Sequence, residues 1–147
     1  MTVEDVRRLD EDGVAAWDSH DPDRFVGMFA DGFEFRESSL PEPLTTTDQV
    51  REYMNSWFTA FPDLHVAATD RVISDDSVAG EIEFTGTHTG PLTAGGQQIP
   101  ATGKSVRSTA AYLFHVKDGK ISSFSARPDT MDLMMQLGIM GSPSAGQ

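Results

Sequence analysis

The 147-residue sequence contains no cysteine. A disulfide framework, a thiol nucleophile and thiolate metal ligands are therefore excluded. Its histidines are also few and scattered, at positions 20, 65, 88 and 115, without the HxH or HExxH spacing of metal-binding motifs. No Gly-rich phosphate loop or serine elbow is present, because TAGGQQ has no helix after it to receive a phosphate. These absences argue against metalloenzymes, thiol enzymes and nucleotide-dependent enzymes.

Basic residues are scarce as well. Lys and Arg number 11 against 23 Asp and Glu, which gives a formal net charge of -12. Nucleic acids and anionic membranes attract proteins with a positive surface, so neither is an expected partner. The N-terminal stretch MTVEDVRRLDED is acidic and lacks a hydrophobic run, so we expect no signal peptide and no membrane span. A cytoplasmic location follows by default.

The most informative stretch is the last third of the chain. From Ser105 to Val116 the even positions form a mostly apolar strand face, and Asp118-Gly119 predicts a tight turn into a second strand. A three-residue loop with a bulge would pair residues whose numbers sum to about 236. Even positions then meet even positions, and Arg107 falls opposite Asp129. This predicts one cavity-facing surface made of Ser108, Ala110, Tyr112, Phe114, Ser122, Phe124 and Ala126.

The remaining pattern predicts helices near 3–19, 22–29 and 47–61 and strands at 33–35, 65–73 and 77–88. The polar, Gly- and Pro-rich segment between His88 and Lys104 predicts a mobile lid. A short helix follows the last strand. We therefore expect an α+β domain over residues 1–141, with three N-terminal helices around a cone-shaped, curved sheet of antiparallel or mixed strands, and a disordered tail at 142–147.

Several strings occur in a characteristic order: AWDSHDPDRFVGMFADGFEF, FPDLHV, GTHTGPL, IPATGK, DGKI and PDTMDLMMQLG. This order resembles that of the SnoaL-like polyketide cyclases, a branch of the nuclear transport factor 2-like fold. The similarity extends from about Val3 to Met140. The resemblance implies a cone-shaped barrel with a deep apolar pocket, often a homodimer, and no cofactor.

The resemblance also locates the site. Aldol-type cyclases of the family remove a proton with an Asp three residues before the strand-end Asp, which looks like Asp129 here, so the base position is Ala126. Two His positions of the family correspond to Phe124 and Tyr112, and an Asn position to Phe35. We therefore expect an antibiotic-type polyketide cyclase that folds a linear polyene for a non-aldol ring closure, such as an intramolecular [4+2] cycloaddition (a Diels–Alderase).

Two residues are catalytic candidates. Tyr112 faces the apolar interior, where its hydroxyl either finds a partner or donates to a substrate carbonyl. Asp129 is either an acid of the site or the N-cap of the last helix, with Asp132 completing a capping box and Arg107 as ion-pair partner. The candidate substrate-binding residues are Trp17, Phe35, Tyr53, Trp57, Phe84, His88, Ala110, Phe124 and Ala126.

Two other classes of function stay open. A cofactor-free hydrolase or isomerase, of epoxide or ketosteroid type, would need a carboxylate in the pocket, and Asp129 and Glu34 are the candidates. A non-catalytic binding protein would have the same pocket without turnover. The methionines of the last helix (Met131, Met134, Met135 and Met140) form a soft apolar surface for a pocket mouth or a dimer contact.

Overall fold

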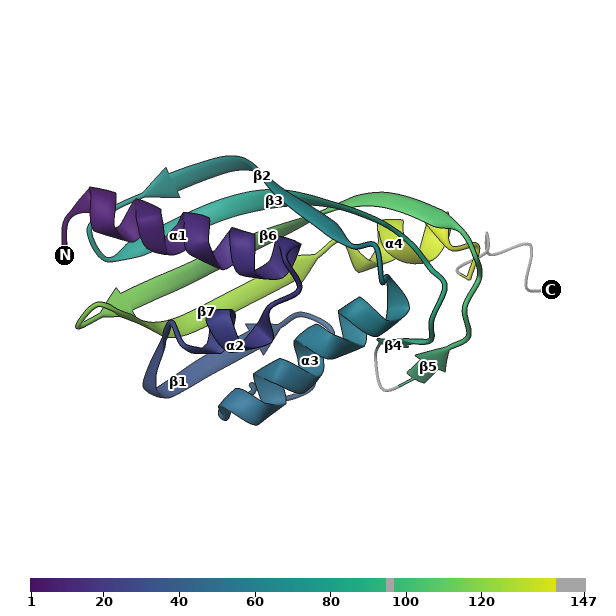
Figure 1. Cartoon of the computed structure of the whole chain (residues 1–147), viewed down its shortest axis with the longest axis horizontal. Helices are drawn as coiled ribbons and strands as arrows, with labels where there is room; N and C mark the ends of the chain where they lie inside the picture. The colour runs from purple at the N-terminus through teal and green to yellow at the C-terminus, as the bar shows by residue number, and fades with distance from the viewer. Residues whose placement is uncertain (95–96, 140–147) are drawn as a thin grey trace.

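The computed structural model describes residues 1–94 and 97–139, and its main feature is one curved, unclosed sheet with helices against its inner face (Figure 1). This arrangement confirms the expected α+β class. Three N-terminal helices and a short C-terminal helix accompany the sheet. The predicted disordered tail, Met140, and Gly95 and Gly96 of the predicted lid lie outside the described residues.

The N-terminal helices begin at side-chain caps. They are α1 (Val3–Asp18), α2 (Pro22–Val26) and α3 (Thr47–Ala60). In α1 the Thr2 hydroxyl accepts from the Asp5 backbone N–H, and the Asp5 carboxylate accepts from that of Thr2, which satisfies two amides that the first turn leaves free. In α3 the cap is Thr46, whose hydroxyl accepts from the Gln49 backbone N–H. Among the described residues, no helix has the length and apolar character needed to cross a bilayer.

The five-stranded sheet has the order β1-β7-β6-β3-β2. Its strands are β1 (Phe29–Glu37), β2 (His65–Ile73), β3 (Ser77–Thr87), β6 (Ser105–Lys117) and β7 (Lys120–Pro128). β1 runs parallel to β7, and the other pairs are antiparallel. Part of the predicted lid instead forms a small ribbon of β4 (Leu92–Ala94) and β5 (Gln97–Ile99). Within this segment Leu92 is buried against the C-terminal part of α3, and the role of a lid stays a prediction.

The β6–β7 hairpin keeps the predicted faces but not the predicted register. Asp118 and Gly119 both have positive φ, so the turn has two residues rather than three, and Lys117 pairs with Lys120. Ser122 is then an extra residue in β7, and after this bulge Tyr112 pairs with Ala126, where the expected partner was Phe124. Beyond the bulge even residues still meet even residues, whereas on its turn side Val116 pairs with Ile121. The bulge places Ile121 rather than Ser122 on the inner face.

The ion pair expected between Arg107 and Asp129 is absent. Arg107 binds Glu83 at 2.6 Å instead. Asp129 is the N-cap of α4 (Thr130–Gln136), where its carboxylate accepts from the Asp132 backbone N–H at 3.1 Å. The second half of the expected capping box does not form, because the Asp132 carboxylate accepts from Ser108 and Gln136. Ser108 is therefore buried but does not line the cavity described below, because its hydroxyl donates to Asp132 of α4.

Candidate functional site

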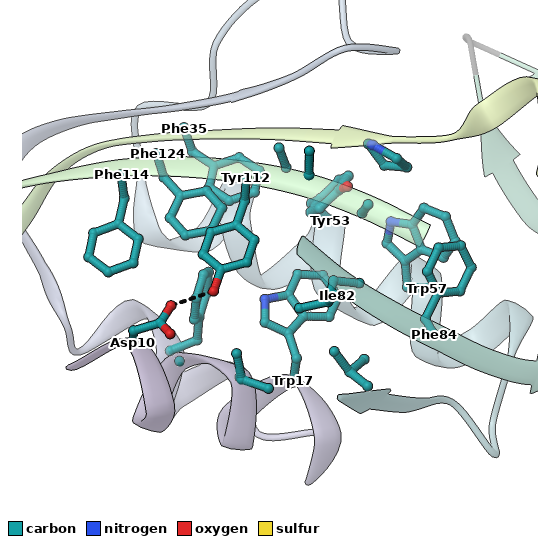
Figure 2. Close-up of a pocket in the computed structure, with 18 of the residues that line it drawn as sticks. Asp10, Trp17, Phe35, Tyr53, Trp57, Ile82, Phe84, Tyr112, Phe114 and Phe124 are labelled. Atoms are coloured by element: carbon teal, nitrogen blue, oxygen red, sulfur yellow. Dashed lines mark hydrogen bonds between the residues drawn. The ribbon is translucent and has the colours of Figure 1, made fainter. Parts of the chain in front are cut away.

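A cavity lies between the inner face of the sheet and helices α1 and α3 (Figure 2). Its volume is about 110 Å³. The side chains that surround it are almost all apolar or aromatic. They are Leu9, Asp10, Gly13, Val14, Trp17, Phe25, Phe35, Tyr53, Trp57, Leu64, Val66, Ile82, Phe84, Ala110, Ala111, Tyr112, Phe114, Ile121, Phe124, Ala126 and Pro128. Such a cavity suits an apolar small molecule.

Most of the predicted site residues meet in this cavity. The four positions that the resemblance assigns to the family's acid–base set, which are Phe35, Tyr112, Phe124 and Ala126, all line it, and so do Trp17, Tyr53, Trp57, Phe84 and Ala110. These residues come from two helices and four strands. The period-two alternation of β6 and β7 predicts only those on the hairpin. That these residues bind substrate stays a prediction.

His88, which was predicted to bind substrate, does not line the cavity. Its side chain is buried beside Phe61, with ring centroids 5.4 Å apart. Nδ1 lies 3.0 Å from the Thr102 hydroxyl and accepts from the Thr102 backbone N–H at 3.2 Å. Burial lowers the pKa of His88. The residue therefore ties the end of β3 to the segment before β6.

The two carboxylates considered from the sequence also lie away from the cavity. Glu34 is exposed and pairs with Arg36 at 3.0 Å, because it alternates with the buried Phe33 and Phe35 along β1. Asp129 serves as the α4 cap. Of the described methionines in α4, Met131 and Met135 are exposed, whereas Met134 is buried, and none of the three lines the cavity.

One wall of the cavity is an aromatic stack along the inner face of the sheet. The rings of Phe35 and Phe124 lie 5.2 Å apart and 8° from parallel. Phe124 also stacks at 5.8 Å on Tyr112 and on Phe114. Cross-strand pairing explains the stack, since Phe35 and Phe114 flank Phe124 on the neighbouring strands. The wall is therefore broad, flat and apolar.

A buried carboxylate that the sequence did not predict lies on α1, beside the Tyr112 end of this wall. Asp10, from α1, is 2% exposed, and it lines the cavity (Figure 2). The Tyr112 hydroxyl donates to its Oδ1 at 2.5 Å, and Arg71 Nε donates to its Oδ2 at 2.6 Å. Both oxygens thus have strong partners, as a buried charge requires. Asp10, Arg71 and Tyr112 are called the Asp10 cluster below.

A row of paired residues across all five strands positions this cluster. Arg71 pairs with Gly80, Gly80 with Tyr112, Tyr112 with Ala126, and Ala126 with Glu37. A Cβ at Gly80 would lie 2.4 Å from Tyr112 Cζ, so the phenol leans across β3 only because position 80 has no side chain. The small residues beside Tyr112 therefore let its hydroxyl reach α1.

The electrostatics of the cluster keep the phenol protonated. Burial raises the pKa of Tyr112 well above its ordinary value, and the hydrogen bond to Asp10 and the charge of Asp10 raise it further. Burial opposes the charge of Arg71, but the charge of Asp10 and the hydrogen bond to it outweigh this effect and raise the Arg71 pKa. At neutral pH Tyr112 is therefore a phenol that donates to an anchored carboxylate.

The sequence did contain one signal for Asp10. Val6, Asp10, Gly13 and Trp17 recur at helical spacing, and Val6, Asp10 and Gly13 are buried in α1. A carboxylate in the middle of an apolar helical stripe is rarely buried without a partner. The partner itself, Arg71, comes from a strand far along the chain, and no local pattern points to it.

A second buried carboxylate lies at the β1 end of the row of paired residues that contains Tyr112. Glu37 is 6% exposed, and it accepts from the Ser39 backbone N–H at 2.6 Å and from the Ser39 hydroxyl at 2.8 Å. Burial raises the pKa of the nearby Tyr53, and the charge of Glu37 contributes to the rise. Among the described residues, no group of three or more His, Asp or Glu side chains is arranged to hold a metal ion.

Comparison with solved structures shows the fold. AclR from Streptomyces galilaeus, a proposed hydroxylase, is 23% identical with a TM-score of 0.81, and the match covers 96% of this chain and 85% of AclR. TsrD from Streptomyces laurentii is 24% identical with a TM-score of 0.80, over 95% and 99% of the two chains. A proposed SnoaL-like polyketide cyclase from Jannaschia sp. CCS1 is 23% identical with a TM-score of 0.76, over 96% and 92%.

No curated protein matches the sequence. The family model described as SnoaL-like polyketide cyclase matches residues 7–137, which include every strand of the sheet and all the residues that line the cavity. The order of elements, the curved sheet and the inner cavity agree with that match. The chain therefore belongs to the SnoaL-like polyketide cyclase family.

Proposed function

We propose that the protein is a cofactor-independent cyclase of a polyketide pathway, which folds a linear polyene for a non-aldol ring closure such as an intramolecular [4+2] cycloaddition. One observation carries the proposal. The positions where aldol-type members of the family have their acid–base residues are occupied here by Phe35, Tyr112, Phe124 and Ala126, and these side chains form a wall of the cavity.

A wall of this kind supplies shape rather than proton transfer. Holding two reacting parts of one molecule in a near-reactive geometry can remove up to about 7–11 kcal/mol of barrier in favourable cases. The stacked rings of Phe35, Phe124 and Tyr112 present a flat apolar surface, against which a conjugated chain can lie. A pericyclic closure needs no base, so the loss of the family's Asp at position 126 costs such a reaction nothing.

Acid–base chemistry is the second candidate, and Asp10 is the observation that favours it. The phenolic oxygen of Tyr112 would take a proton from the substrate as its own proton moves to Asp10 Oδ1. With this chemistry the protein would be an isomerase or a hydrolase. Arg71 also bonds to Asp10 and anchors it beside Tyr112, which fits a residue that positions the phenol and supports the cyclase over the alternative.

A test needs the linear polyene precursor made by the polyketide synthase of the pathway. In single-turnover reactions, the cyclase proposal expects ring closure faster than in buffer, without deuterium from D₂O entering the product. Deuterium incorporation at a carbon beside a carbonyl would contradict a pericyclic closure and support the acid–base alternative. Binding without acceleration would support the third possibility, a non-catalytic binding protein.

The domain limits, assembly and location also remain proposals. We propose one domain over residues 1–141, a homodimer and a cytoplasmic protein. Light scattering on the eluting peak of a size-exclusion column measures the assembly directly. A mass equal to two chains supports the homodimer, and a mass equal to one chain contradicts it.

A further inference from the structure

The polar atoms that face the cavity form a donor–acceptor pair on its α1 side. The indole N–H of Trp17 makes no hydrogen bond with any described residue, and it is not fully buried, because His88 Nε2 is the only fully buried side-chain N or O atom without a partner in the described part of the chain. Trp17 lines the cavity. Figure 2 shows the indole nitrogen on the side of the ring that faces the Tyr112 hydroxyl.

Tyr112 complements this donor with an acceptor. A phenol has one proton, and Tyr112 gives it to Asp10, so toward the cavity its oxygen can only accept. Donation to a carboxylate polarises the phenol and makes its oxygen a better acceptor, an effect that a low-dielectric cavity strengthens. Arg71 holds Asp10 in place from outside the cavity, with 25% of its side chain exposed.

We propose that Trp17 and Tyr112 bind a hydroxyl group of the substrate, with Asp10 as the residue that positions Tyr112. A hydroxyl accepts from the Trp17 N–H and donates to the Tyr112 oxygen, and so uses both atoms. A carbonyl satisfies only the indole, and an ammonium satisfies only the phenol. The inference rests on the proposed function only in treating the cavity as the substrate site, and it names a hydroxylated polyene as the substrate class.

Neighbouring residues hold both rings of this subsite in place. The Trp17 ring is held by edge-to-face contacts with Phe25, Tyr53 and Phe58, with centroids 5.9, 6.0 and 5.6 Å away. The Tyr112 ring lies over Gly80, as described above. Both rings are therefore fixed before a ligand arrives, which lowers the entropy cost of binding.

Binding of two matched probes, 2-indanol and indane, to the full chain tests the subsite by calorimetry. The quantity of interest is the ratio of their dissociation constants, because it cancels changes in cavity volume. Relative to the wild type, Tyr112→Phe and Trp17→Phe should each shift the ratio against 2-indanol by about five- to tenfold, the loss of one hydrogen bond. Asp10→Asn, which keeps an acceptor for Tyr112 but loses the charge, should shift it about threefold.

Ser122→Ala is the control, since it removes a hydroxyl from β7 that does not line the cavity, and it should leave the ratio unchanged. An unchanged ratio in Tyr112→Phe and Trp17→Phe, or an equal shift in Ser122→Ala, would overturn the proposal. So would a wild-type protein that binds neither probe at millimolar concentration. If the ratio stays constant while the wild type still accelerates ring closure, the subsite is wrong and the cyclase proposal survives.

Discussion

The two sides of the cavity differ in what they offer a substrate. On the β1–β7 side, Phe35, Phe124 and Ala126 present only carbon. On the α1–β2 side, the Asp10 carboxylate bonds to both Tyr112 and Arg71. Arg71 neutralises the charge of Asp10, and Asp10 in turn fixes the Tyr112 ring, which also stacks on Phe124 at 5.8 Å. We infer that this protein uses charge to hold a side chain still, and leaves the carbon-only wall to set the shape of the substrate.

Filling the apolar wall should have the largest effect. Ala126→Phe adds a ring beside Phe124 and Tyr112, so the substrate loses the space in which it folds. We expect a loss in single-turnover rate on the order of 10²-fold or more, corresponding to roughly 2.7 kcal/mol. Circular dichroism checks that the variant is folded. A folded variant with unchanged turnover would show that this wall does not shape the substrate. Trp57→Ala, which removes a wall on α3, should also lower the rate.

A side chain at position 80 should lower the stability of the protein, because it would displace Tyr112. Gly80→Ala places a methyl group 2.4 Å from Tyr112 Cζ, so the phenol must move away from Asp10. We expect a loss of about 1–3 kcal/mol in the free energy of unfolding, measured by urea denaturation. Gly13→Ala is the control, because its Cβ would meet Met28 at an ordinary 3.6 Å and an alanine favours the helix. Equal stability of the two variants would contradict the role given to Gly80.

The tyrosines offer a test by titration. The chain has only two, Tyr53 and Tyr112, and burial raises the pKa of both above the ordinary value of 10.0. In the folded protein, absorbance at the tyrosinate band should therefore show no step at pH 10, whereas in concentrated urea both should titrate there. Above pH 10 the unfolded chain loses protons that the folded chain keeps, so the free energy of unfolding should fall as the pH rises. A step near pH 10 in the folded protein would mean that a phenol is solvated.

Removing the hydrogen bond of Tyr112 should have an intermediate effect on turnover. Tyr112→Phe keeps the stacked ring but leaves Asp10 with Arg71 as its remaining partner in the cluster. We expect a loss of roughly threefold to tenfold, since one hydrogen bond contributes about 0.5–1.5 kcal/mol. The rate is measured in the same single-turnover reaction, and a loss beyond 10²-fold would favour a chemical role for the phenol.

The smallest effect is expected at the α4 cap. Asp129→Asn replaces one good N-cap with another, and Asp129 is not among the residues that line the cavity. Turnover should stay within about tenfold, corresponding to roughly 1.4 kcal/mol, with little change in stability. A folded but inactive variant would return Asp129 to the list of catalytic candidates.

What the sequence predicted well was local. The alternation of β6 and the Asp118-Gly119 turn predicted which face of the hairpin carries Tyr112 and Phe124, because side chains alternate whatever the register. The register itself could not be predicted, because it depends on positive φ at Asp118 and on the extra residue Ser122. The error in register also produced the wrong ion-pair partner for Arg107.

What the sequence failed to predict was long-range. The Asp10 cluster joins residues 61 and 102 positions apart, and it forms only when α1 crosses the inner face of the sheet. The prediction for His88 was wrong for a related reason. Its burial depends on Phe61, the C-cap of α3, and on Thr102, which follows the β4–β5 ribbon. Burial of a polar residue is a property of its partners, which local patterns do not contain.

The most direct test of the account is the single-turnover rate of Asp10→Asn on the linear precursor, compared with the wild type. The central claim is that shape drives the reaction and that Asp10 only positions Tyr112. The account predicts a folded protein, a rate within about tenfold of the wild type, and no deuterium from D₂O in the product of either. A folded Asp10→Asn protein that loses on the order of 10²-fold or more would contradict the account and identify Asp10 as part of an acid–base mechanism.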